Sequence, residues 1–199
     1  MPREQHVAEG VPVSWDDVHD SRAGFRACLE AFSRPGIAID GAPRPHLSDD
    51  RAEDAAAGVL LSLLDPGLAL AAAGGAATSE LASRLRELTG AVDAPVEEAD
   101  FVLAGAGRAP DVATRARRGS ALAPDRGATL VVVSGMGERC EAELNGPGVA
   151  GTFAVEVPLT AADLAALERA NAAPPQGVDV IATAADGSLV GLPRSVVGG

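Results

Sequence analysis

The chain has 199 residues, of which 47% are hydrophobic and 22% charged, a composition typical of a globular domain and not of a disordered segment. All 16 basic residues are arginine, which excludes enzymes that need a lysine for a Schiff base with pyridoxal phosphate or for a Walker motif. The net charge of −12 excludes broad binding to nucleic acid or to anionic membranes, because both require a basic surface.

Two further absences bound the location and the cofactors. No apolar run approaches the length of a membrane span and the N-terminus lacks a signal-peptide core, so we expect a cytoplasmic protein. Cys28 and Cys140 are too few for an iron–sulfur or zinc site, and the three histidines lack metal-ligand spacing. We therefore expect no metal and no cofactor. A single domain over residues 1–199 is predicted, with a loosely ordered segment at 1–14.

The first half of the chain is predicted to alternate helices with short strands. Apolar residues at helical spacing, capping residues and Pro-Gly stops mark the helices, whereas short apolar runs mark the strands. The predicted elements are a helix over 16–33 with the apolar stripe Phe25, Cys28, Leu29 and Phe32, a strand over 37–39, a helix capped by Ser48 and running to Leu64, a strand over 68–72, and a helix capped by Thr78 and ended by Gly90.

Strands dominate the second half. The run at 128–134 is the strongest β signal, and the alternation at 139–144 predicts that this segment pairs with it as a hairpin. Helices that alternate with short strands, with hairpins late in the chain, indicate an α/β fold in which helices cover both faces of a mixed sheet. The other predicted elements are a strand at 100–104, a helix capped by Thr160 and closed by Asn171, and a closing hairpin of 178–182 with 188–192.

Three glycine-containing segments invite comparison with phosphate-binding loops, which need a helix directly after the glycines. The segment 135–137 precedes a strand-like sequence, so a simple turn is favoured there. After 105–108, Pro110 and Asp111 indicate a loop. The pair at 74–75 precedes a helix, and either it brings backbone amides to a phosphate or it is a plain strand-to-helix turn.

Positive charge is concentrated between residues 108 and 126, a segment that contains five arginines and only two aspartates. Arginine forks bind phosphate or carboxylate oxygens bidentately, so Arg115, Arg117 and Arg118 are candidates for an anion site or for a face that docks an acidic partner. A solvated loop is the alternative.

Two other places break the local pattern. The turn at 145–148 contains more turn-forming residues than a hairpin needs, which indicates a close backbone approach and makes Asn145, Gly146 and Gly148 candidates. Asp179 interrupts an apolar strand, and a buried carboxylate needs a partner, for which Arg194 is the first choice. Both a structural ion pair and a catalytic role remain open for this pair.

Several of these irregular segments resemble the PhnH family, the H subunit of the bacterial carbon–phosphorus lyase complex. The similar segments keep their order and spacing from about residue 21 to residue 195, although the arginines at 115–118 match no family feature. The segments are FRACLEAFSRPG at 25–36, GSALAPDRGATL at 119–130, LNGPGV at 144–149, PQGVDVI at 175–181 and LPR at 192–194.

The resemblance implies a three-layer α/β/α fold like the large domain of transferases that depend on pyridoxal phosphate (PLP), without that cofactor. It also implies a homodimer that joins the G, I and J subunits of a core complex. That complex forms ribose 1-phosphonate 5-triphosphate from MgATP and an alkylphosphonate, with release of adenine. The family supplies no catalytic residue, so we expect a structural or assembly role. The alternative is a free-standing α/β enzyme or binding protein for a phosphorylated small molecule.

Overall fold

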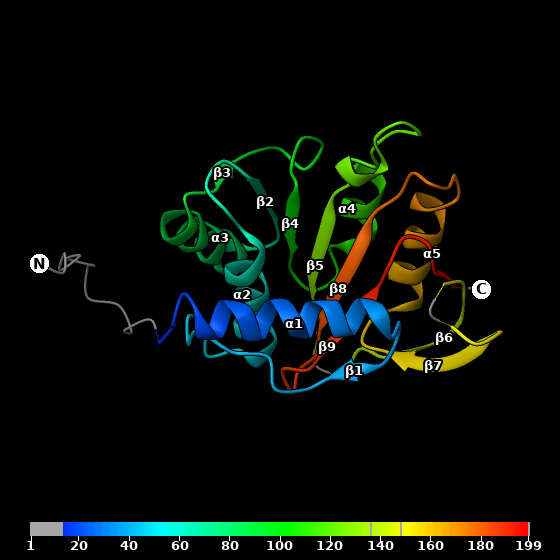
Figure 1. The fold of residues 1–199 in the computed structure, drawn as a ribbon, viewed down its shortest axis with the longest axis horizontal. Helices are drawn as coiled ribbons and strands as arrows, with labels where there is room; N and C mark the ends of the chain where they lie inside the picture. The colour runs from blue at the N-terminus through cyan, green and yellow to red at the C-terminus, as the bar shows by residue number, and fades with distance from the viewer. Residues whose placement is uncertain (1–13, 136, 148, 199) are drawn as a thin grey trace, which may run out of the picture.

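A seven-stranded sheet runs through the computed structural model, which describes residues 14–135, 137–147 and 149–198 (Figure 1). Five neighbouring strands are parallel, and β9 joins their edge antiparallel, so the predicted mixed sheet is confirmed. In spatial order the strands are β1 (Ala38–Ile39), β9 (Leu189–Leu192), β8 (Asp179–Thr183), β5 (Thr129–Val133), β4 (Phe101–Ala104), β2 (Ala69–Ala73) and β3 (Val92–Asp93).

Helices cover both faces of this sheet, as the sequence predicts (Figure 1). Successive strand residues alternate between the two faces, because side chains in a strand point to opposite sides. Leu103, Val131 and Ile181 pack with the helices α1 (His19–Ser33), α2 (Arg51–Leu63) and α3 (Ala76–Thr89). The preceding residues Val102, Leu130 and Val180 pack with α4 (Ala109–Arg115) and α5 (Ala161–Ala170).

A second, three-stranded antiparallel sheet contains β10 (Val197–Gly198), β6 (Cys140–Asn145) and β7 (Phe153–Val157), in that order. The predicted hairpin between 128–134 and 139–144 is therefore wrong. Strand β5 lies between β4 and β8, so both of its edges are already paired and it has no free edge for β6. The strands β3, β7 and β10 were not expected from the sequence.

Helix ends follow capping chemistry, although not always at the predicted residue. Helix α2 is capped by Asp50, whose carboxylate accepts hydrogen bonds from the Ala52 and Glu53 amides, and not by Ser48. Helix α3 begins directly after Gly75, so Thr78 lies inside its first turn. The predictions of Thr160 as the cap of α5 and Gly90 as the C-terminal residue of α3 are confirmed, with Gly90 at φ 74°.

The apolar stripe predicted for α1 is only partly buried. Small residues line the contact with α2, and a Cβ atom on Gly24 would overlap the Ser62 hydroxyl, so the two helices approach closely. Cys28 is buried in the same core cluster, and burial raises the pKa of its thiol to about 12. Phe25 and Leu29 are instead 47% and 54% exposed.

Candidate functional site

The amino-terminal edge of the parallel strands contains most of the predicted site residues. Asp179, the first residue of β8, pairs with Arg194 as the sequence predicts. The Arg194 Nε donates to Asp179 Oδ2 at 3.0 Å, and the Arg194 backbone amide donates to Oδ1 at 2.8 Å. Both carboxylate oxygens are therefore satisfied, which is how a largely buried charge is stabilised.

The same guanidinium also holds the loop that leads into β5. Its Nη1 donates to the carbonyl of Pro124, and a Cβ atom on Gly127 would overlap Nη1 and the Gly177 carbonyl. Glycine is needed at position 127 because the guanidinium passes directly over it. The pair therefore fastens the loop at 119–127 to β8, which is a structural role.

The three candidate arginines point to separate partners and do not form a joint anion site. Arg115 donates from Nε to Glu97 at 2.8 Å, a hydrogen bond that lowers the pKa of the Glu97 carboxyl below its ordinary value. Arg117 pairs with Asp100, whose other oxygen accepts from the Ala69 amide at 2.9 Å. The Nε of Arg117 is buried without a hydrogen-bond partner within the described part of the chain.

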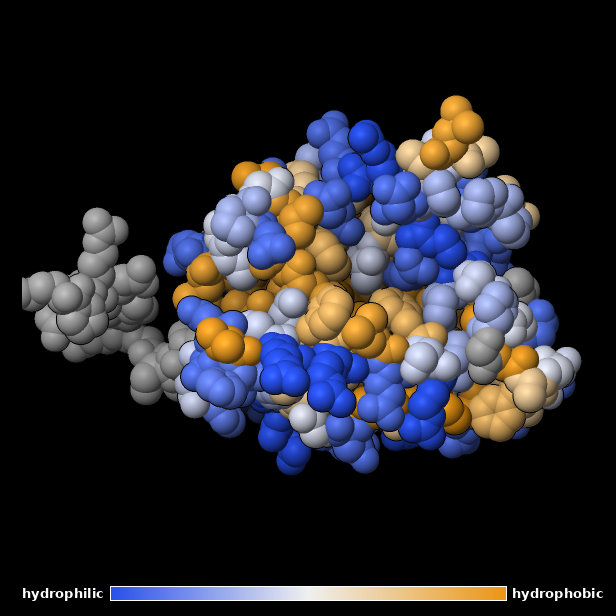
Figure 2. All heavy atoms as spheres, in the orientation of Figure 1, coloured by the Kyte–Doolittle hydropathy of each residue, from blue (hydrophilic) through white to orange (hydrophobic). Residues whose placement is uncertain are grey.

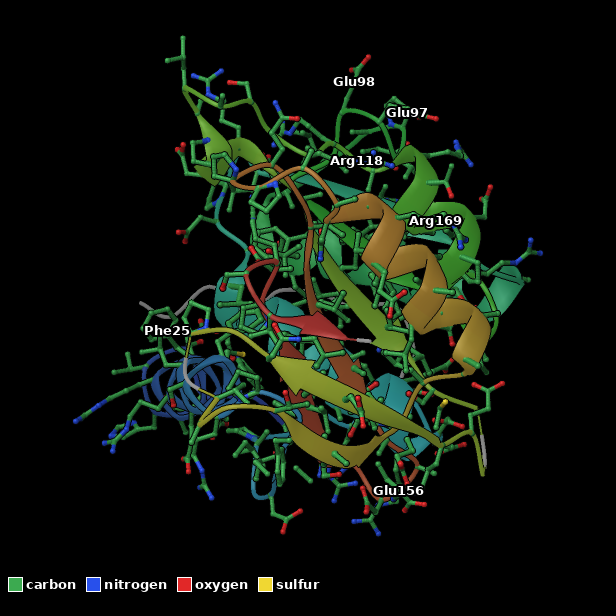
Figure 3. All side chains as sticks on the ribbon, turned by 90° about the vertical axis from the view of Figure 1, so that its right-hand side faces the viewer. Phe25, Glu97, Glu98, Arg118, Glu156 and Arg169 are labelled. Carbon is green, nitrogen blue, oxygen red and sulfur yellow. The ribbon has the colours of Figure 1, made fainter. Side chains whose placement is uncertain are left out.

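Arg118 differs from the other two arginines. Figure 3 shows it toward the same end of the molecule as Glu97 and Glu98, and its Nη2 donates to the carbonyl of Thr114 at 3.4 Å. No ion pair involves it among the residues that the structure describes. Of the three candidates, only Arg118 keeps its charge available for an external anion or an acidic partner.

The glycine turn approaches the chain's own C-terminal segment. Asn145 ends β6 and lies opposite Val197 of β10. Gly146 has a φ of 128°, and a Cβ atom there would lie 2.5 Å from the Ser195 carbonyl oxygen. The expected close approach is therefore internal and closes the small sheet. Gly148 falls outside the described residues.

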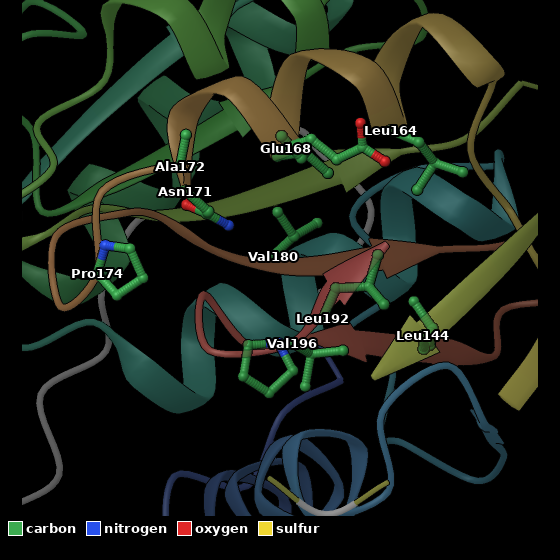
Figure 4. A pocket seen from close by; sticks show the side chains of 11 residues that line it. Leu144, Leu164, Glu168, Asn171, Ala172, Pro174, Val180, Leu192 and Val196 are labelled. Carbon is green, nitrogen blue, oxygen red and sulfur yellow. The ribbon is translucent and has the colours of Figure 1, made fainter. Parts of the chain in front are cut away.

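An apolar cavity of about 290 Å³ lies between α5 and the strands β6, β8 and β9 (Figure 4). The Asn171 side chain lines this cavity but already has hydrogen-bond partners. It accepts from the Val178 amide at 2.8 Å and donates to the Val178 carbonyl at 3.2 Å. Glu168 at the rim is the ionisable group of the lining. The lining residues are Leu144, Leu164, Leu167, Glu168, Asn171, Ala172, Pro174, Val180, Leu192, Pro193 and Val196.

This cavity suits an apolar group, and it offers no Ser, Thr, Cys, His or Lys side chain for nucleophilic attack. Across residues 14–135, 137–147 and 149–198, no cluster of three His, Cys, Asp or Glu side chains is arranged to hold a metal ion. Within the same ranges, no helix is long and apolar enough to cross a membrane.

At the carboxyl-terminal edge of the sheet, the sequence analysis singled out the pair at 74–75 but missed the helix that follows β4. The segment 105–108 leads from β4 directly into α4, so it is a strand–loop–helix connection and the predicted loop at Pro110 is wrong. The signal that identifies this helix is Pro110 itself, since proline is favoured in the first turn, where its missing amide has no helical partner.

A comparison with protein-family models matches residues 12–197 to the family described as bacterial phosphonate metabolism protein (PhnH). The chain belongs to the PhnH family. The match extends over all five α-helices of the described structure and over both sheets except for the last residue of β10, so the PhnH resemblance of the sequence segments is confirmed. This membership places the chain in bacterial phosphonate metabolism. No curated protein matches the chain.

Proposed function

We propose that this PhnH-family chain is a non-catalytic subunit of the carbon–phosphorus lyase core complex, which it joins as a homodimer together with the G, I and J subunits. In this proposal the complex works in the cytoplasm and forms ribose 1-phosphonate 5-triphosphate from MgATP and an alkylphosphonate. In the same proposal, the fold is like the large domain of PLP-dependent transferases, and this chain holds no cofactor. Family membership over residues 12–197 supports it.

The observation that carries the subunit role is the apolar face that α1 presents to solvent. Val18, Phe25 and Leu29 are spaced by seven and four residues, so they follow one line along the helix axis. All three are exposed, Val18 by 71%. Figure 2 shows apolar side chains among charged ones along the α1 side of the molecule.

Such a line is what a subunit interface needs. Burying a large apolar side chain stabilises an association by about 1.5–3 kcal/mol, and aromatic residues often dominate interface energies. The neighbouring Arg22 and Arg26 are exposed and supply a polar rim around Phe25. Two other candidate features are used internally: Asp179 and Arg194 hold the loop before β5, and Gly146 closes the small sheet.

Native mass spectrometry after co-expression with the G, I and J subunits tests this function. We expect the unmodified chain to enter a larger stoichiometric assembly. The double variant Phe25→Ser/Leu29→Ser should remain outside it with an unchanged melting temperature, because both side chains are already largely exposed. Leu88→Ser is the matched control, since Leu88 is 45% exposed on α3, and this variant should assemble normally.

The possible outcomes separate the parts of the proposal. A chain that ignores all three subunits contradicts the subunit role and favours the free-standing enzyme or binding protein for a phosphorylated molecule. Normal assembly of the double variant retains the subunit role and rejects the α1 face as the interface.

A further inference from the structure

The sheet reverses its direction of growth between β2 and β4. From β2 the chain passes through α3 to β3 at the sheet edge, whereas from β4 it passes through α4 to β5 on the other side. Helices α3 and α4 accordingly cover opposite faces of the sheet. In open parallel sheets, ligands bind in the crevice beyond the carboxyl ends of the strands at such a switch point.

Each of the two strands at this crevice is followed directly by glycine. Gly74 and Gly75 follow β2, and Gly105 follows β4. A Cβ atom on Gly105 would lie 2.8 Å from Thr78 Oγ1 and 3.4 Å from the Gly74 Cα, and a Cβ atom on Gly74 would overlap Thr78 as well. Only glycine allows the two loops to meet around the Thr78 side chain.

The first turn of α3 opens at this meeting point. Gly75 is the cap residue and supplies no side-chain hydrogen bond to the first backbone amides of the 14-residue helix. Uncapped amides at a helix N-terminus carry a partial positive charge and bind oxyanions.

Thr78 is a second and independent indication of a ligand. Its residue is 6% exposed, yet its hydroxyl has no hydrogen-bond partner within the described part of the chain. The hydroxyls of Ser79 and Thr89 on the same helix instead donate to the carbonyls of Gly75 and Leu85, at 3.2 Å and 2.8 Å. The hydroxyl oxygen lies against Gly74 and Gly105 and is not sealed from solvent, so it is available to hydrogen-bond a ligand in the crevice between them.

A polar cavity of about 340 Å³ runs along β2 from Ala71 to Gly74. Two arginines line it. Arg115 lines it but is neutralised by Glu97 and Asp111, at 2.8 Å and 3.2 Å. Arg108 lines it too and forms no ion pair among the described residues. In a chain of net charge −12, this uncompensated guanidinium is a local attraction for an anion.

We propose that the crevice between β2 and β4 binds the tetrahedral oxyanion group of a phosphonate or a phosphate ester. Arg108 supplies a charged fork, the first-turn amides of α3 supply neutral donors, and the Thr78 hydroxyl supplies a further hydrogen bond. The choice of a phosphorus oxyanion rests on the proposed function in phosphonate metabolism, whereas the site itself rests on the geometry.

Titration of the full chain with methylphosphonate and, separately, with inorganic phosphate tests the site by calorimetry at about 0.15 M NaCl, where long-range attraction is screened. We expect saturable binding of a single anion per chain. Arg108→Ala should weaken it by about tenfold or more, the loss of a charge-assisted hydrogen bond. Arg126→Ala is the matched control, because Arg126 is also an exposed arginine, and it lies on the loop before β5, away from the crevice lining.

Thr78→Val provides an independent measurement. The hydroxyl has no partner in the described structure, so the variant should keep its melting temperature while binding the anion several-fold more weakly. Tighter binding of methylphosphonate assigns the site to phosphonates, and tighter binding of phosphate assigns it to phosphate esters. Failure of the unmodified chain to bind either probe saturably overturns the site, as does an equal loss in the Arg108 and Arg126 variants.

Assembly measured on the same variants keeps the two proposals apart. Arg108→Ala should still enter the complex in native mass spectrometry. A chain that assembles but binds neither anion contradicts the crevice site alone, whereas a chain that binds an anion but never assembles contradicts the subunit role alone.

Discussion

At the scale of single residues, Arg194 connects more of the chain than any local pattern indicates. Its guanidinium neutralises Asp179 at the start of β8 and also donates to the carbonyl of Pro124 in the loop before β5. The side chains of Arg194 and Asp179 are only 16% and 23% exposed. Removing one partner would leave the other charge largely desolvated, which is the most damaging way to break an ion pair.

Arg194→Ala should therefore lower the free energy of unfolding by about 3 kcal/mol, as measured by urea denaturation. Arg194→Lys retains the charge but loses the planar fork, so its free energy of unfolding should lie between those of the unmodified chain and Arg194→Ala. Arg118→Ala is the control, because it removes an arginine that has no carboxylate partner among the described residues, and it should change stability by less than about 0.5 kcal/mol. An unchanged denaturation midpoint for Arg194→Ala would show that the pair contributes nothing.

The contact partner of a residue can be predicted from sequence only where the residue stands out from its neighbours along the chain. Asp179 stands alone among apolar neighbours, and a buried carboxylate demands a cation, so its pairing with Arg194 is predictable. The pairing of Arg117 with Asp100 is not, because Asp100 closely follows Glu97 and Glu98 and therefore does not stand out as a lone carboxylate in an apolar segment. Gly146 shows the same limit, since its turn residues indicate a close approach without identifying Ser195 as the neighbour.

At the scale of elements, helix ends are predictable where a single capping residue is available and ambiguous where two compete. Thr160 is an unambiguous cap for α5 and forms a reciprocal capping box with Asp163. Ser48 and Asp50 both suit the start of α2, and Asp50 caps the helix because its carboxylate accepts two amides. Helix α4 was missed because it has only 7 residues, too few for a clear apolar period.

Thr160→Ala should destabilise the protein by about 1 kcal/mol, because it removes the hydroxyl that accepts from the Asp163 amide and leaves a helix amide unsatisfied. Thermal or urea unfolding measures this loss. Thr114→Ala is the matched control, since its hydroxyl donates to the Pro110 carbonyl inside α4 and caps no helix end. Equal stabilities of the two variants would mean that the capping box contributes no more than an interior threonine.

At the scale of the whole molecule, the layers are predictable but the order of strands is not. Alternation of helices and short apolar strands indicates a sheet covered on both faces, which the two core clusters confirm. The partners of β6 depend on which strand edges are already occupied, and β5 is paired on both sides by residues distant in sequence. The switch point between β2 and β4 likewise exists only in the assembled sheet, so the sequence marks the glycines at 74–75 and 105 separately without showing that they meet.

The net charge of −12 also has a consequence for the whole molecule, and the small sheet is one place where like charges meet. Glu141 of β6 lies directly opposite Glu156 of β7, and Glu143 follows two residues along the same exposed face. None of the three forms an ion pair within the described residues. Like charges that face each other across a ladder are destabilising, and so is the self-repulsion of a strongly charged chain.

The melting temperature should therefore rise when NaCl increases from about 0.01 M to about 0.15 M, because the screening length falls from about 30 Å to about 8 Å. Glu141→Gln should stabilise the protein by about 0.2–1 kcal/mol at low salt and reduce this salt dependence. Glu97→Gln is the control, since Glu97 pairs with Arg115 and the variant removes the same charge without relieving repulsion. If both variants stabilise equally, the total charge of the chain matters and the facing glutamates do not.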